Sequence, residues 1–168
     1  AESKEVKEKF ASVTRIPSSS VEIHGLTEKY LFAEELSPKG RPKLKKSALT
    51  FSELAPLMLK LFQVDNTFEK GLPIYLVFHN APFDVRFINS EMRVAGLPFI
   101  ESFALILDTI KEARSLLPGM PNYSLDSLYE HVVEVTGAEV IERPFHDART
   151  DSEILAVLLG YLLAISGK

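Results

Sequence analysis

Three side chains suited to metal binding or proton transfer lie beside predicted helix starts: Asp84, His146 and Asp151. Carboxylate oxygens are the ligands that Mg²⁺ and Mn²⁺ prefer, and an imidazole can take a proton from an attacking water. Two carboxylates at the starts of two core-facing helices would form a good ligand set for such a cation, with His146 as general base. The alternative is that each aspartate only favours its helix start through the helix dipole, and that His146 is a surface loop residue.

Asp84 follows a strand-to-helix junction in the stretch "LVFHNAPFDVRF". Residues 74–78 form a continuous apolar run, which predicts a strand buried on both faces. Asn80 is the predicted N-cap of the next helix, Pro82 suits its first turn, and Gly96 is expected just past its end. α/β proteins bind ligands at the carboxyl ends of sheet strands, so this junction is a candidate site.

Asp151 opens the last predicted helix, in "HDARTDSEILAVLLGYLLAI". A carboxylate on the buried stripe of a helix is costly unless a cation or partner neutralises it. Thr150 and Glu153 are expected to form a capping box, and the apolar part, residues 154–165, a helix buried on most sides. Three leucines share the face of Asp151 at helical spacing: Leu155, Leu158 and Leu162.

The remaining segments alternate between predicted strands and helices, which indicates an α/β fold. An edge strand is expected in "EVKEKFASVTR", a loop at Pro17 and the three serines that follow it, and a short helix after Gly25. Further along, "FSELAPLMLKLFQ" predicts a helix, "FALILDTI" a strand that ends at Asp108, and "SLDSLYEHV" a helix capped by Asn122 or Ser124.

Several aromatic and polar side chains are expected in the core, at the surface or at a turn. Phe83 is expected in the core. Asp108 either orients the site or only caps a turn. His79 is expected to be a packed strand-end residue and His131 a surface residue. The other phenylalanines expected in the core are Phe87, Phe99 and Phe103.

The chain of 168 residues, with 46% hydrophobic and 25% charged residues, has the composition of one soluble globular domain. The absence of cysteine excludes disulfides and thiolate metal sites. No signal peptide is expected, since the first nine residues are mostly charged, and the longest apolar stretch is too short for a membrane span. The net charge of −4 argues mildly against a general nucleic-acid binder, although the basic segment 37–47 either contacts phosphates or is a solvated insertion.

Two segments resemble signatures of the DEDDh (DnaQ-like) 3′-5′ exonucleases, a family of the ribonuclease H-like superfamily. "HNAPFDVRFINSEM" is similar to the second signature and "HDARTDSEILAVLL" to the third, a His-x-Ala-x-x-Asp pattern. "IPSSSVEIHGLTEKYL" and "DTIKEARSLLPGMPNYSLDSL" also resemble family segments, so the similarity runs from about residue 6 to residue 164. The resemblance implies a ribonuclease H-like α/β fold, a central mixed β-sheet flanked by helices, in one domain over residues 1–168.

The resemblance also implies roles for particular residues. Asp84 and Asp151 would bind two Mg²⁺ or Mn²⁺ ions, with His146 as general base. Asn80 would lie near the terminal nucleotide, with His24 and Leu26 at its base or sugar. Phe83, as the alternative to its core position, would line the nucleotide pocket. The implied activity is hydrolysis of single-stranded DNA or RNA ends to nucleoside monophosphates, in proofreading or end-trimming. The implied partners are single-stranded nucleic acid and a polymerase or other protein subunit, and the implied location is intracellular, in the cytoplasm, the nucleoid or the nucleus, without a membrane.

One family signature is missing. The first signature, Asp-x-Glu, supplies two of the four metal-binding carboxylates, and the chain's only such tripeptide, at residues 151–153, already belongs to the third signature. By the family order, the chain is expected to start after the first two strands of the sheet, so that half of the metal-binding carboxylates and the central strand are absent from this sequence. Two interpretations follow: a fragment of an active enzyme, or a relative without catalysis that binds nucleic acid or a protein partner.

Overall fold

A computed structural model of the chain describes residues 16–34, 44, 46–64, 73–142 and 147–167. The chain divides into two compact units, one of residues 1–54 with 143–147 and one of residues 55–142 with 148–168. The predicted edge strand and most of the basic segment 37–47 lie outside the described residues. Each unit is described by itself below.

The first unit contains two short helices, α2 (Ser18–His24) and α3 (Glu28–Leu31). The predicted loop at the three serines is wrong, because Pro17 occupies the N-cap position of α2 and its carbonyl accepts the first hydrogen bonds of the helix. Gly25, with φ of 69°, ends α2 in the left-handed conformation that glycine adopts easily. The Thr27 hydroxyl then caps α3 by accepting from the Tyr30 amide at 3.0 Å.

The helix α4 (Phe51–Val64) confirms the helix predicted from apolar spacing, and it crosses from the first unit into the second. The Glu53 carboxylate, which was not predicted to cap this helix, stabilises its start. The Thr50 amide donates to Glu53 Oε2 at 2.9 Å, which is the reciprocal half of a capping box.

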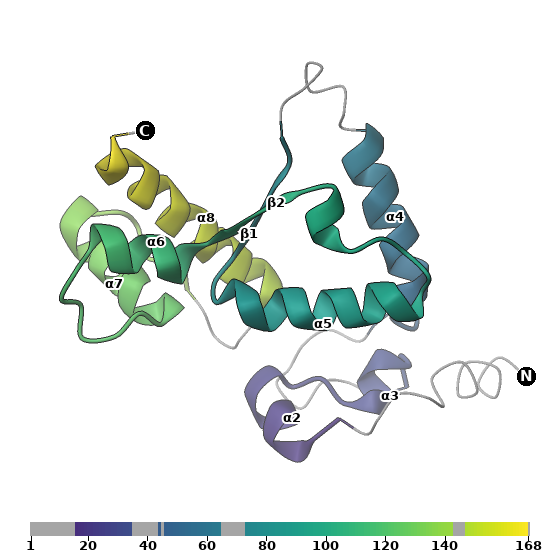
Figure 1. The fold of residues 1–168 in the computed structure, drawn as a ribbon. Coiled ribbons are helices and arrows are strands. Elements are labelled where there is room, and N and C mark those ends of the chain that lie inside the picture. Colours follow the sequence, from purple (N-terminus) through teal and green to yellow (C-terminus); the bar gives the residue numbers. More distant parts are fainter. Residues whose placement is uncertain (1–15, 35–43, 45, 65–72, 143–146, 168) are drawn as a thin grey trace, which may run out of the picture. The chain divides into compact units, whose positions relative to one another are not determined.

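The sheet of the second unit has two parallel strands within the described residues, β1 (Tyr75–Phe78) and β2 (Leu105–Asp108). The two strands lie side by side (Figure 1), and the register pairs Tyr75 with Leu105 and Phe78 with Asp108. Both predicted strands are confirmed, but β1 is not buried on both faces. Tyr75 is 56% and its partner Leu105 50% exposed, because two described strands leave one sheet face partly uncovered at its amino end.

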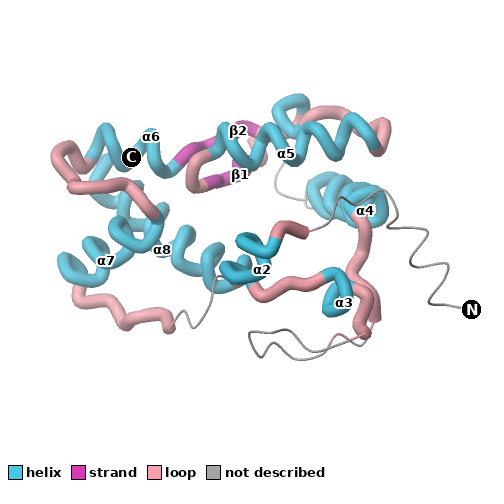
Figure 2. Tube along the Cα trace, turned by 90° about the horizontal axis from the view of Figure 1, so that it is seen from below, coloured by secondary structure: helices cyan, strands magenta, loops and turns pink. Residues whose placement is uncertain are grey.

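The connection between the strands is α5 (Ala81–Val94) followed by the 3₁₀ turn η2 (Ile100–Ser102). α5 contacts both strands and runs beside them (Figure 2). Met92 is buried on its packed face, one turn after the half-buried Ile88. The mixed α/β architecture is therefore as predicted, and the helix ends at Ala95 and Gly96 as expected.

The expectation that α5 packs through its phenylalanines is wrong. Phe83 and Phe87 are 60% and 59% exposed and contact each other, with ring centroids 4.9 Å apart. They lie on a different side of the helix from Ile88 and Met92, since the helical period separates the two pairs. Phe99 is also exposed, whereas Phe103 is half-buried.

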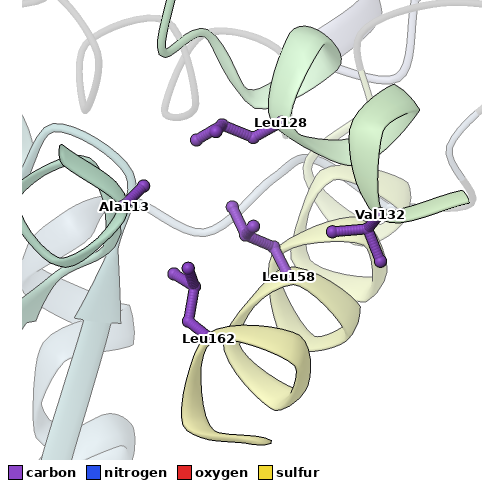
Figure 3. Close-up of a cluster of buried hydrophobic side chains, with 5 residues drawn as sticks. All are labelled: Ala113, Leu128, Val132, Leu158 and Leu162. Carbon is purple, nitrogen blue, oxygen red and sulfur yellow. The ribbon is translucent and has the colours of Figure 1, made fainter. Parts of the chain in front are cut away.

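The main core lies among α6 (Thr109–Leu116), α7 (Leu125–Thr136) and α8 (Ala148–Ser166). Ser124 is the N-cap of α7, which confirms one of the two predicted alternatives. Its hydroxyl accepts a hydrogen bond from the Ser127 amide at 3.2 Å. The side chains of the core cluster point toward one another (Figure 3): Ala113, Leu128, Val132, Leu158 and Leu162.

Two expectations for α8 are wrong. The helix begins at Ala148, so Thr150 already lies inside its first turn and cannot cap it, and Glu153 pairs with Arg149 at 3.1 Å. The apolar part is buried along one stripe rather than on most sides, since Leu163 and Ile165 are exposed. None of the helices in the described part of the chain has the length and apolar character needed to span a membrane.

Candidate functional site

The junction between β1 and α5 has an unusual backbone conformation. Asn80 has φ of 73° and ψ of 54°, a left-handed conformation that is uncommon for residues other than glycine and is best tolerated by asparagine, aspartate and histidine. Asn80 occupies the predicted N-cap position, but its side chain makes no capping hydrogen bond. A capping side chain typically needs an extended backbone at this position, whereas the backbone of Asn80 is left-handed. The side chain of Asn80 is exposed instead.

The end of β2 holds this junction from the side. Asp108 Oδ1 accepts the Asn80 amide at 3.1 Å and the Ile110 amide at 3.0 Å. Asp108 therefore caps α6 and also binds the backbone that leads into α5. The capping role considered for it from the sequence is confirmed, whereas its role in orienting a site stays a prediction. The sequence signal for the cap was an aspartate just before a helix, but nothing in it indicated a bond to Asn80.

His79 is part of the same junction. Its Nδ1 lies 2.9 Å from the hydroxyl of the fully buried Thr109, which donates to the Phe78 carbonyl at 3.2 Å. Because the hydroxyl has one proton, we assign the Nδ1–H of His79 as donor to Thr109. Burial lowers the pKa of His79, and this effect outweighs that of the nearby carboxylates, which act in the opposite direction. His79 is thus a packed strand-end histidine, as predicted.

Asp84 lies in the first turn of α5 and is half-buried. Burial raises the pKa of its carboxyl, and the charge of Asp108 acts in the same direction, against its own backbone hydrogen bond and His79. A bound cation would relieve both the burial and the like charge. However, the described residues contain no group of three or more acidic, histidine or cysteine side chains placed to hold a metal ion. A divalent-cation site at Asp84 therefore stays a prediction.

The raised pKa of Asp84 predicts that Asp84→Asn slightly stabilises the metal-free protein at pH 7. A raised pKa means that the folded state binds more protons than the unfolded state just above the ordinary value of 3.8, so stability falls as the pH rises through the raised pKa. Solvent screens this half-buried group, so we expect a gain in melting temperature of about 1–2 °C at most.

Thermal unfolding in a chelator at pH 7 and at lower pH would measure this, with the exposed Glu134 of α7 as control in Glu134→Gln. The difference should shrink as the pH falls toward the ordinary carboxyl range. A lower melting temperature for Asp84→Asn at pH 7 would show that the charge stabilises the fold.

Asp151 is half-buried in the first turn of α8, as predicted. The buried residues of its stripe are Ile154, Leu158 and Leu162, so Ile154 rather than Leu155 is the first apolar residue that the core covers. The convergence of Asp151 with Asp84 stays a prediction.

The other predicted site residues are spread over the chain. His146 lies outside the described residues, as does the side chain of His24, whose backbone ends α2. Leu26 is half-buried in the first unit, and Phe83 is exposed on α5 beside Asp84. The structure brings together His79, Asn80, Asp84, Asp108 and Thr109.

Comparison with known proteins confirms the resemblance to the DEDDh, or DnaQ-like, exonuclease family. The similar proteins are named DNA polymerase III subunit epsilon. The protein from Buchnera aphidicola of Acyrthosiphon pisum is 32% identical over 154 residues, which are 91% of this chain and 52% of that protein. The Rickettsia typhi protein is 32% identical over 144 residues, 84% of this chain and 50% of its own length.

The Haemophilus influenzae protein is 37% identical over 94 residues, which are 55% of this chain and 34% of that protein. No protein-family model matches the chain. The chain spans about half the length of the first two of these relatives. Their similarity therefore supports the family resemblance.

Proposed function

We propose that this chain is part of a metal-dependent 3′-5′ exonuclease that removes nucleotides from single-stranded DNA ends in proofreading. The observation that carries the proposal is the half-buried carboxylate of Asp84, which follows the carboxyl end of β1 in the parallel strand pair. Burial raises the pKa of this carboxyl group. A divalent cation at this position would stabilise the ionised form of the Asp84 carboxyl. Similarity to proteins named as DNA polymerase subunits supports DNA over RNA as substrate and a polymerase as partner.

In this proposal Asp84 and Asp151 would hold Mg²⁺ or Mn²⁺, and the bound cation would supply positive charge to polarise the scissile phosphate and stabilise developing charge on its oxygens. His146 takes a proton from the attacking water as its oxygen bonds to phosphorus, and the bond from phosphorus to the 3′ oxygen breaks. The exposed side-chain amide of Asn80 hydrogen-bonds the terminal nucleotide. The exposed ring of Phe83 offers an apolar face to its base, and His24 with Leu26 contacts the base or sugar.

A second candidate function follows from the missing Asp-x-Glu signature. Without those two carboxylates, the same fold would bind single strands or a protein partner without hydrolysis. An activity assay of the native gene product, at its natural length, distinguishes the two candidates. The protein is incubated with Mg²⁺ or Mn²⁺ and a single-stranded oligonucleotide labelled at its 5′ end. A ladder that shortens from the 3′ end supports the enzyme, and binding without shortening supports the second candidate. DNA and RNA oligonucleotides of one sequence decide the substrate.

We expect Mn²⁺ to bind this chain weakly, because it contributes only two of the family's four carboxylates. Paramagnetic broadening of amide signals should be strongest in the first turns of α5 and α8 in the wild type. It should fall at both places in Asp84→Asn and remain in the control Glu134→Gln. Equal broadening in wild type and Asp84→Asn would show that Asp84 is not a ligand.

A further inference from the structure

The two hydrogen bonds of Asp108 connect the ends of both strands. Its Oδ1 accepts the Ile110 amide at the start of α6 and the Asn80 amide at the start of α5. The register places Asp108 opposite Phe78, so its side chain reaches the backbone that leaves β1 two residues later. Both helix starts in this junction are therefore tied to one carboxylate oxygen.

We propose that Asp108 is a positioning residue, which holds the left-handed turn at Asn80 and thereby sets the place of Asp84. The inference rests on the proposed role of Asp84 as a metal ligand. Asp108 itself acts through the backbone in this scheme and does not bind the cation.

The conformation of Asn80 explains why such a tie is needed. A left-handed backbone at a residue other than glycine persists where surrounding interactions over-determine it. The Asn80 carbonyl accepts the Phe83 amide at 3.0 Å, so the same residue begins the hydrogen bonding of α5. Asp84 follows one helical turn later, and a change in the Asn80 turn would tilt that turn and move the carboxylate.

A separate contact keeps the strand ends together without Asp108. The hydroxyl of the buried Thr109 donates to the Phe78 carbonyl at 3.2 Å, and His79 Nδ1 lies 2.9 Å from the same hydroxyl. Loss of the Asp108 carboxylate should therefore release the Asn80 amide while β1 and β2 stay paired. This makes the proposal testable in a folded protein.

The test compares Asp108→Ala with Asp108→Asn in the full chain. Asparagine keeps an oxygen that accepts both amides, whereas alanine removes it. In Asp108→Ala, exchange of the Asn80 amide with solvent should rise by about tenfold or more. Affinity for Mn²⁺, measured by line broadening near Asp84, should fall on the order of tenfold. This is the loss typical when a residue that orients a metal ligand is removed.

Asp108→Asn should restore both measurements to near wild-type values. The control is Ser124→Ala, which removes the N-cap of α7 and should leave the Asn80 amide protected. If Asp108→Asn loses Mn²⁺ as fully as Asp108→Ala, Asp108 acts through its charge, and the positioning role is wrong. An unchanged Asn80 amide in Asp108→Ala would overturn it as well. If the wild type binds no Mn²⁺ while Asn80 exchange still rises in Asp108→Ala, the proposed function fails and the hold on Asn80 stands.

Discussion

Replacing His146 with alanine in the native gene product should lower the rate of 3′-end hydrolysis by about 10²–10⁴-fold and leave single-strand affinity nearly unchanged. A general base acts as the water attacks, so its loss raises the barrier of the chemical step and not the free energy of binding. The rate of the wild type should rise with pH across the range where imidazole ordinarily titrates, around pH 6.5, and the variant should lose this rise.

The matching control is His131→Gln, at a histidine on α7 whose ring contacts Tyr161 rather than any predicted site residue. It should keep the activity and the pH profile of the wild type. Hydrolysis by His146→Ala at the wild-type rate would remove His146 from the mechanism. Hydrolysis absent from the wild type, together with intact strand binding, would leave the non-catalytic interpretation.

The sequence predicted the parts of the site that local signals determine. The apolar run at residues 74–78, a proline in the next first turn and a glycine after Ala95 correctly indicated a strand and a helix with Asp84 at its start. The helical spacing of apolar residues likewise placed Asp151 on the stripe that α8 buries. These patterns depend on residues within one or two turns of each other, where periodicity and capping decide the structure.

Features that depend on distant residues escaped prediction. The left-handed backbone of Asn80 is tied to Asp108, which is 28 residues further along the chain. The exposure of Phe83 and Phe87 depends on which side of α5 the sheet covers, and composition alone suggested a core role. The start of α8 at Ala148 removed the capping box that the sequence offered at Thr150. In each case a tertiary contact or a helix start, and not residue type, determined the outcome.

The core behind α8 provides the second large expected effect. Leu158 is fully buried between α6 and α7, in the cluster with Ala113 and Leu128 (Figure 3). Leu158→Ala should lower the free energy of unfolding by about 2–5 kcal/mol, because the neighbouring side chains cannot fill the space that is left. For a chain of this size the melting temperature should fall on the order of 10 °C.

Leu163→Ala is the matched control, since it makes the same substitution on the same helix at a side chain that is 45% exposed. It should change the free energy of unfolding by no more than about 0.5–1 kcal/mol. Urea unfolding at fixed pH measures both variants, and a similar urea dependence in each shows that the same surface is exposed on unfolding. Equal losses in the two variants would mean that α8 is not held by this core. The first turn of α8, with Asp151, would then need another support to bring its carboxylate to a shared metal site.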